Sequence, residues 1–541
     1  MNPILTPGID IVQPGSAYLL RDEFTTDRAA GAVNGTAAEP GPGTRVAADT
    51  NSKLTISSAA LTFATGGAAA GDPGVWLNLV ARAAGRVLVA EITPANVDGS
   101  AGVGWDTNTS GAINDALRLA ATGALSLVAN SGTAFTVGTY TAASLKVAAV
   151  MRGTGVFWFA YLSSKWVLLY RTEAGTANVY PAINAIGTTS IFTSSYLRVP
   201  LARWLPTPLV SDGFGSAFGT SDGLGHAEGV AGGIGAGGSG VTFSNAGATW
   251  SVSGGKAINT PTLGAELFDA DAAVFTSGTY HWAAIGSNTI ANVGNALQVT
   301  YVNNSGGAQL TLANSEDLSS DLTIDQWYTL SALVSVNLNT CSLLFGNYFA
   351  SAVTIYPTVI TSTFYAVSTN TMVIRQADMG AGQIVTVDNL SLRPVSLSEL
   401  LSVSNLACID VLAGVAITST YKNRVGLALN WDSAASPANG VIVTLNNTDV
   451  VFYRCVAGVW SIVSTTAFTY SAGARLVVQK NGTEYRTYYN NALIKVDTIA
   501  DAGILSNTLH GLFGTDATST FDDYVAFATG TSSEYTALDA F

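Results

Sequence analysis

The sequence has few charged residues. Asp, Glu, Lys and Arg make up 11% of its 541 residues, against 48% hydrophobic residues. Disordered chains have the opposite balance, so we expect a packed protein. The net formal charge is −13 and the 23 basic residues form no basic run. A broad nucleic-acid surface requires clustered Lys and Arg, so nucleic acid is excluded as an expected partner.

Long hydrophobic runs are also missing. The best candidate stretches are interrupted by Arg82 and Arg86, or by Arg152 and Lys165. A membrane-spanning helix needs about 18 uninterrupted apolar residues, so we expect no membrane insertion. Residues 1–12 carry prolines and an acidic residue in place of a basic and then apolar leader, so we expect no secretory signal.

Cysteine and histidine are rare. Cys341, Cys408 and Cys455 stand singly in apolar surroundings, which predicts small buried side chains rather than disulfides or metal ligands. A nucleophilic triad would need a histidine near Ser or Cys. The three histidines are isolated from one another, and we interpret them as hydrogen-bonded structural groups. They are His226, His281 and His510.

Glycine and short apolar runs are abundant. The 56 glycines separate stretches rich in Val, Leu, Phe and Tyr, a pattern typical of strands joined by tight turns. The length fits about three domains of ordinary size. The sequence therefore predicts an all-β protein with almost no helix, apart from a short turn at 396–402.

A repeated pattern indicates where domains close. Similar strands followed by short linkers occur at Ser195–Pro200 and Asp388–Pro394, and a third occurs at Asp522–Phe527. Similar openings occur at Arg21–Phe24 and Ser211–Phe214. We therefore predict three tandem β-sandwich domains after an extended arm. Their ranges are 1–17 for the N-terminal arm, then 18–205, 206–400 and 401–541 for the sandwiches.

The first and third units share a further motif. Trp105-Asp106 and Trp431-Asp432 each end an apolar run and precede a polar loop and a second apolar run. Downstream, Asn481-Gly482 between two alternating strands predicts a type I′ hairpin turn. In the second unit, 326–334 and 342–345 predict a half-buried hairpin.

These features resemble a known family. An opening Asp-x-Phe, a Trp-containing strand, a Gly-turn hairpin and a closing Asp-Asp/Asn strand are similar to concanavalin A-like lectin and glucanase jelly rolls, including laminin-G-type domains. The resemblance covers Tyr18 to Gly530 and concerns the fold more than a ligand. Tandem low-charge β units behind a Pro-rich leader are also similar to tail, fibre and head-decoration proteins of tailed bacteriophages.

Glucanases of this fold carry carboxylates in a Glu-x-Asp-x-x-Glu strand pattern. The sequence lacks that pattern, so we predict no catalytic residues and no enzymatic activity. The glycine-rich segment 213–240 lacks the Lys-Ser/Thr and the following helix of a phosphate loop, which predicts no cofactor. The acidic groups nearest to a catalytic set are interpreted as turn caps. They are Asp22-Glu23 with Asp27, and Glu316-Asp317 with Asp321.

Two kinds of ligand remain open. A structural Ca²⁺ is one of them, because related sandwiches hold it with a closing-strand carboxylate and an opening acid. Asp388 with Asp212, and Asp522 or Asp523, occupy those places. Sugars could stack on aromatic residues, although core packing is favoured for most of them. The pool is Trp105, Trp166, Tyr170, Trp431, Tyr453, Trp460, Tyr485, Tyr488 and Tyr489, and we expect either Tyr488 or Tyr489 to be exposed.

The sequence thus favours a bacteriophage virion component in the tail, a fibre or the head decoration. Its expected partners are copies of itself, other virion proteins and host-surface glycans. The alternative is a glycan-binding adhesin at a cell surface or secreted. An exposed aromatic platform would favour the adhesin, and a large apolar contact surface would favour the virion protein.

Overall fold

A computed structural model describes residues 18–541 with internal gaps. The gaps are 51, 65–73, 95–99, 110–111, 153–154, 173–176, 187–191, 207–208, 213–242, 246–248, 254, 285–286, 303–308, 314–316, 321, 338–340, 346–349, 354–357, 367–370, 377–380, 406–407, 419–424, 446–447 and 531–534. The predicted arm 1–17 and the segment 213–240 lie outside the described residues.

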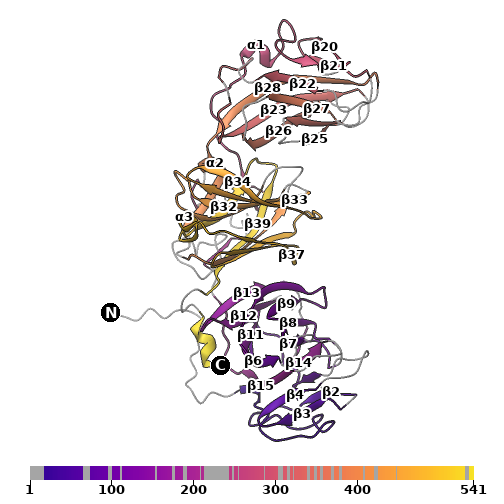
Figure 1. Ribbon diagram of the computed structural model, residues 1–541, viewed down its shortest axis with the longest axis vertical. Helices are drawn as coiled ribbons and strands as arrows, with labels where there is room; N and C mark the ends of the chain where they lie inside the picture. Colours follow the sequence, from indigo (N-terminus) through magenta and orange to yellow (C-terminus); the bar gives the residue numbers. More distant parts are fainter. Residues whose placement is uncertain are drawn as a thin grey trace, which may run out of the picture.

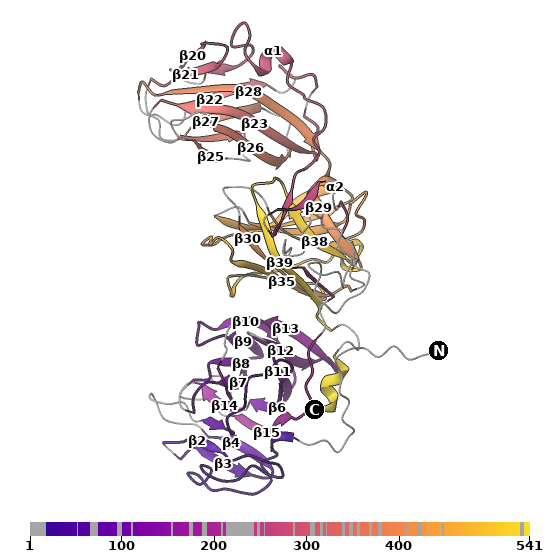
Figure 2. The ribbon, with the colours of Figure 1, turned by 180° about the vertical axis from the view of Figure 1, so that it is seen from behind.

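The prediction of an all-β fold is confirmed. Six antiparallel sheets form three sandwiches, which follow one another along the long axis of the molecule (Figures 1 and 2). In the described residues, helix is limited to single short turns, one of which lies inside the predicted 396–402 segment. These turns are α1 (Ala270–Ala273), α2 (Leu397–Leu400), α3 (Ala502–Leu505) and the 3-10 turn η2 (Thr536–Ala540). No helix in the described ranges has the length and apolarity to cross a membrane.

The first sandwich pairs an eight-stranded sheet with a seven-stranded one. The larger sheet contains β1 (Tyr18–Asp22), β3 (Leu54–Ser57), β4 (Ala60–Phe63), β6 (Val87–Pro94), β11 (Leu145–Met151), β12 (Val156–Leu162), β13 (Lys165–Arg171) and β15 (Phe192–Pro200). The smaller contains β2 (Val46–Ala48), β5 (Gly74–Trp76), β7 (Ser100–Asp106), β8 (Asp115–Ala120), β9 (Ala124–Val128), β10 (Phe135–Thr139) and β14 (Tyr180–Ile186).

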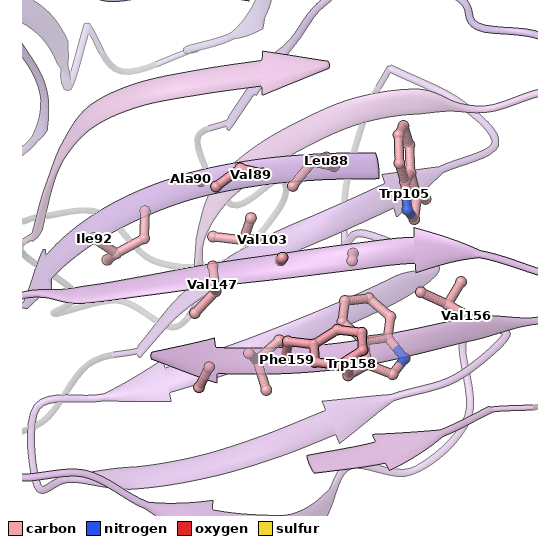
Figure 3. Close-up of a cluster of buried hydrophobic side chains, with 14 of the residues drawn as sticks. Leu88, Val89, Ala90, Ile92, Val103, Trp105, Val147, Val156, Trp158 and Phe159 are labelled. Carbon is pink, nitrogen blue, oxygen red and sulfur yellow. The ribbon is translucent and has the colours of Figure 1, made fainter. Parts of the chain in front are cut away.

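Alternating side chains of the two sheets form the core of this sandwich. Leu88, Val103, Trp105 and Val147 are at most 2% exposed, and they come from β6, β7 and β11 (Figure 3). Because successive strand residues point to opposite faces, each strand contributes every second side chain to the core.

The second sandwich is the smallest and has two five-stranded sheets. One sheet contains β19 (Ala283–Ala284), β22 (Gln309–Ala313), β24 (Cys341–Phe345), β25 (Ala350–Val353) and β27 (Thr371–Gln376). The other contains β20 (Thr289–Asn292), β21 (Leu297–Thr300), β23 (Trp327–Val336), β26 (Thr358–Tyr365) and β28 (Ile384–Val395). The predicted hairpin differs here, because β23 pairs with β26 and β28 rather than with β24.

The third sandwich is assembled from two separate segments of the chain. Its eight-stranded sheet contains β16 (Val210–Asp212), β17 (Trp250–Ser253), β18 (Lys256–Asn259), β30 (Val411–Thr418), β35 (Arg475–Asn481), β36 (Glu484–Tyr489), β37 (Ala492–Thr498) and β39 (Thr520–Ala528). Its six-stranded sheet contains β29 (Leu401–Asn405), β31 (Val425–Trp431), β32 (Gly440–Leu445), β33 (Asp449–Val456), β34 (Val459–Ala467) and β38 (Leu509–Gly514).

The order of the sandwiches therefore differs from the predicted tandem. Strands β16, β17 and β18 lie within the predicted range 206–400, yet they belong to the sheet of β39 and β30. The second sandwich is inserted into the third, between β18 and β29. Its entry and exit lie together, because Gly264 N donates to Pro394 O at 2.7 Å and Asn259 Nδ2 donates to Glu399 O at 2.9 Å. The predicted boundaries assume that each sandwich is built from one continuous segment. Strands β16 and β18 instead pair with β39, which lies more than 250 residues further along the chain.

The repeated closing motif is a β-bulge. The pairing register shifts between Ser194 and Tyr196 in β15, and at the corresponding places in β28 and β39. At the bulges of β28 and β39, Asn389 and Asp523 have φ of 51° and 50°. Asn and Asp tolerate this left-handed conformation better than other non-glycine residues, which explains why the sequence repeats Asp-Asn and Asp-Asp there.

Aromatic side chains fill the junction between the first and third sandwiches. Tyr488 packs against Tyr170 with ring centroids 4.8 Å apart, and Phe527 packs against Phe157 at 5.1 Å. Leu168 N also donates to Thr529 O at 3.0 Å. Aromatic pairs of this geometry stabilise contacts beyond their buried area.

A second aromatic junction joins the second and third sandwiches. Trp327 lies 5.5 Å from both Trp460 and Phe513, measured between ring centroids. Trp460 N donates to the Tyr365 hydroxyl at 3.0 Å. Both junctions are buried and apolar, so the three sandwiches are packed on one another rather than joined by bare linkers.

Candidate functional site

The Trp-Asp hairpin of the first sandwich joins β7 to β8. Trp105 is buried in the core, so Asp106 points to the outer face of the sheet. There Trp76 Nε1 donates to Asp106 Oδ2 at 2.7 Å. Ile113, from the hairpin loop, packs with Trp76 in a small apolar cluster on this face. Asp106 is consequently removed from solvent.

Asp115, the first residue of β8, pairs with Trp105 across the hairpin, and its carboxyl interacts electrostatically with that of Asp106. Its Oδ1 accepts a hydrogen bond from Asn130 N at 2.8 Å. Burial raises the pKa of both carboxyls; for Asp115 this outweighs the Asn130 hydrogen bond and the charge of Arg82, which lower the pKa, and the charge of Asp106 adds a small increase. Carboxyls whose pKa is raised by burial are candidates for proton transfer. The sequence analysis missed this pair because its members come from two strands of a hairpin rather than one strand face.

The equivalent hairpin of the third sandwich joins β31 to β32, and a bulge changes it. The register with β38 shifts between Ala428 and Trp431, and Asn430 has a φ of 51°. The bulge turns Trp431 away from the core of its own sandwich and into the junction with the second, 5.6 Å from Trp460. A Cβ at Gly440 would lie 2.4 Å from Trp431 Cδ2, so this strand must carry glycine there.

Asp432 is exposed at the start of the hairpin loop. It accepts hydrogen bonds from Ala438 N at 3.0 Å and from Asn439 Nδ2 at 2.7 Å. Partial burial acts to raise its pKa, but these hydrogen bonds outweigh burial and hold the pKa below its ordinary value. Asn439 Oδ1 in turn accepts a hydrogen bond from Ala457 N at 2.9 Å, which fixes the orientation of the amide. The loop therefore presents a rigid, ionised carboxylate beside an oriented amide.

The histidines differ in their surroundings. His510 is fully buried and bonded through Nδ1 to Asn430 N at 3.3 Å, and burial lowers its pKa to about 4. It is the structural group that the sequence predicts. His281 has an exposed ring, and its Nδ1 lies 2.6 Å from Oδ1 of the buried Asp317. His226 lies outside the described residues.

The acidic groups interpreted as turn caps have mixed roles. Asp22 Oδ1 accepts a hydrogen bond from Phe24 N at 3.0 Å, as a turn cap does. Its main partner, however, is the buried Arg45, whose Nε donates to Asp22 Oδ2 at 2.6 Å. Glu23 pairs with Arg198 of the closing strand at 2.7 Å. Asp317 holds His281, whereas Glu316 and Asp321 lie outside the described residues.

The structure separates the residues considered for Ca²⁺. Asp388 lies in β28 of the second sandwich, whereas Asp212 lies in β16 of the third, opposite Tyr524 of β39. Asp522 and Asp523 are therefore the neighbours of Asp212. Among the described residues, no group of three His, Cys, Asp or Glu side chains could hold a metal ion.

Aromatic side chains do not form an exposed platform among the described residues. All ten tryptophans are at most 9% exposed, and the tyrosines named as possible sugar-stacking residues are buried too. The expectation that Tyr488 or Tyr489 is exposed is wrong. Tyr489 packs in the core of the third sandwich, and the first sandwich covers Tyr488.

Comparison with known proteins finds likeness in structure only. No family profile and no curated protein sequence matches the chain. A carbohydrate-binding module, CBM66 from Bacillus subtilis, is 10% identical, covers 46% of this chain and 96% of its own, and has a TM-score of 0.18. A glycosyl hydrolase family protein from Mycobacterium fortuitum is 13% identical, with 34% and 99% covered and a TM-score of 0.24. A GH16 endo-beta-1,3(4)-glucanase, SCLam, is 11% identical, with 37% and 96% covered and a TM-score of 0.25.

These neighbours are carbohydrate-binding and glucanase jelly rolls of the concanavalin A-like kind. Several are glycoside hydrolases, which contradicts the prediction that the chain is not an enzyme. That prediction used the absence of one strand pattern. Such an absence excludes neither a carboxyl pair across a hairpin nor another arrangement of acids.

Proposed function

We propose that this chain is a carbohydrate-binding component of a bacteriophage virion, with the loop of residues 432–439 as its glycan site. The observation that carries the binding proposal is the Asp432–Asn439 pair, an exposed carboxylate and amide fixed 2.7 Å apart. A carboxylate has about four acceptor positions, so two hydrogen bonds from its own loop leave room for sugar hydroxyls.

The surroundings of the loop support binding of a sugar. Asn507 Nδ2 donates to Asn439 O at 3.4 Å, to Asn430 O at 3.2 Å and to Gly503 O of α3 at 2.7 Å, which ties the loop to α3. Asn430 Nδ2 donates in turn to Ile409 O at 3.0 Å. Polar groups fixed in this way can orient the hydroxyls of a sugar ring.

Both the sequence and the arrangement of the sandwiches support the proposal that the chain is a virion component. A low charge and an apolar, Pro-rich leader suit contacts among copies and neighbouring virion proteins. The two buried aromatic junctions make the described sandwiches one extended body, which would hold a glycan site away from an attachment point.

Binding is tested with a glycan array followed by calorimetry. We expect Asp432→Asn and Asn439→Ala to weaken binding about 10- to 100-fold, the effect of losing one charge-assisted hydrogen bond. Asp516→Asn is the matched control, because Asp516 also caps a loop of the third sandwich through Thr518 N at 2.7 Å. Unchanged affinity in both loop variants would refute this site.

The acid pair of the first sandwich supports a second candidate function, glycoside hydrolysis. Two buried carboxyls with raised pKa that interact electrostatically are an arrangement used for proton transfer. If it acts there, Asp106→Asn and Asp115→Asn each abolish product release from a polysaccharide panel while the protein stays folded. Release that persists in both variants would exclude this pair as the catalytic acids.

A further inference from the structure

Two arginines face each other at one end of the first sandwich. Arg86 precedes β6 and Arg203 follows β15, and they form an isolated antiparallel bridge. Residues directly opposite in such a bridge project their side chains to the same face, where like charges destabilise the pairing. Neither arginine makes an ion pair with a carboxylate among the described residues.

The Arg86 side chain is mostly buried, and two of its guanidinium nitrogens have no partner. The residue is 7% exposed, and its Nε and Nη1 have no hydrogen-bond partner. Burying an unpaired cation is costly, and desolvation together with the charge of Arg203 lowers the pKa of Arg86. An anion bound beside Arg86 would offset this cost.

The backbone holds this arrangement rigidly. Gly85 N donates to Met151 O at 2.9 Å, Met151 N donates to Arg86 O at 2.9 Å, and Trp204 N donates to Gly85 O at 2.8 Å. Gly85 has a φ of 78°, and a Cβ there would lie 3.1 Å from Arg203 Cβ. The two arginines therefore cannot move apart without breaking the end of the sandwich.

We propose that Arg86 and Arg203 form a binding site for an oxyanion, namely a carboxylate, sulfate or phosphate group. Guanidinium groups bind such anions through paired N–H donors. Arg203 is exposed and Arg86 is buried, so an anion from solvent meets Arg203 first. Arg82, four residues before Arg86, is not counted in this site, because its Nη2 donates to Gly155 O at 2.9 Å and its charge interacts with Asp115. This site is in a different sandwich from the glycan loop and does not depend on it.

The test measures calorimetric binding of sodium sulfate, sodium glucuronate and a glucuronate-containing oligosaccharide to the full chain. We expect Arg203→Gln and Arg86→Gln to weaken binding at least about tenfold. Arg28→Gln, which removes one positive charge paired with Glu39 at 3.1 Å, is the control and keeps binding. Binding of sulfate and glucuronate alike supports a general oxyanion site, and binding of the oligosaccharide alone assigns the site to an acidic glycan.

A second readout covers the case in which Arg86→Gln does not fold. In sulfate-free chloride buffer, Arg203→Gln removes a like-charge contact, so its melting temperature should equal or exceed that of the wild type. Sulfate should then raise the melting temperature of the wild type more than that of the variant, at equal ionic strength. Absence of binding by all three ligands, or an equal sulfate response in both proteins, overturns the proposal. We expect Asp432→Asn to bind these anions as the wild type does, so this experiment tests the arginine site independently of the glycan loop.

Discussion

The Trp-Asp hairpins of the first and third sandwiches carry the same dipeptide in opposite orientations. In the first, Trp105 is in the core and Asp106 is buried against Trp76. In the third, the bulge at Asn430 places Trp431 in a junction and leaves Asp432 exposed. One inserted residue moves the tryptophan from the core to the opposite face of its sheet, because strand side chains alternate with a period of two.

The reversal changes the chemistry of the carboxylate. Burial raises the pKa of Asp106, whereas hydrogen bonds from its own loop hold the pKa of Asp432 low despite partial burial. Similar sequence therefore yields a buried carboxyl with a raised pKa in one sandwich and an exposed carboxylate with a lowered pKa in the other. The comparison explains why the two candidate functions are assigned to different hairpins.

The largest expected effect comes from removing the two tryptophans. Trp105→Ala and Trp431→Ala should each cost about 3–5 kcal/mol, because both side chains are fully buried. Trp105→Ala should destabilise the first sandwich alone. Trp431→Ala should in addition loosen the junction, seen as faster proteolysis near 260–264 and 394–400. Loosening of that junction by Trp105→Ala would break the comparison.

A smaller effect is the loss of stability that we expect in the third sandwich when the pH is lowered. His510 has a pKa of about 4 when folded and about 6.5 when unfolded, so the unfolded chain takes up its proton first as pH falls. The third sandwich should lose about 3 kcal/mol between pH 6.5 and 4. Denaturant unfolding across this pH range should show the loss of stability in the control variant His281→Asn. A His510→Asn variant that folds should not show it.

The smallest effect distinguishes Asp106 from Asp432 in thermal melts. Because the folded pKa of Asp106 is raised, its ionisation disfavours the fold, so stability should fall as pH rises above the unfolded pKa of about 3.9. Asp106→Asn should reduce that fall. For Asp432 the sign is opposite, since its lowered pKa gives stability that is lost on acidification. The same pH trend in Asp106→Asn and Asp432→Asn would contradict the assigned environments.

Sequence reasoning predicted the local structure better than the arrangement of segments. Period-two alternation and glycine turns predicted strands, and Asn481-Gly482 predicted the tight turn between β35 and β36, which pair up to Asn481 and Glu484. The insertion was missed because the pairing of β18 with β39 has no local signal. The acid pair and the outward turn of Trp431 were missed for a related reason. Both features depend on contacts between strands. The orientation of Trp431 depends in addition on a bulge that no single residue predicts.

The most direct test of the account is a crystal structure of the chain with a bound oligosaccharide identified on the array. The account predicts sugar hydroxyls within hydrogen-bond distance of the Asp432 carboxylate and the Asn439 amide, with Asp106 still buried against Trp76. Sugar bound at the Asp106–Asp115 pair, with the loop of residues 432–439 empty, would contradict the assignment of binding to the third sandwich.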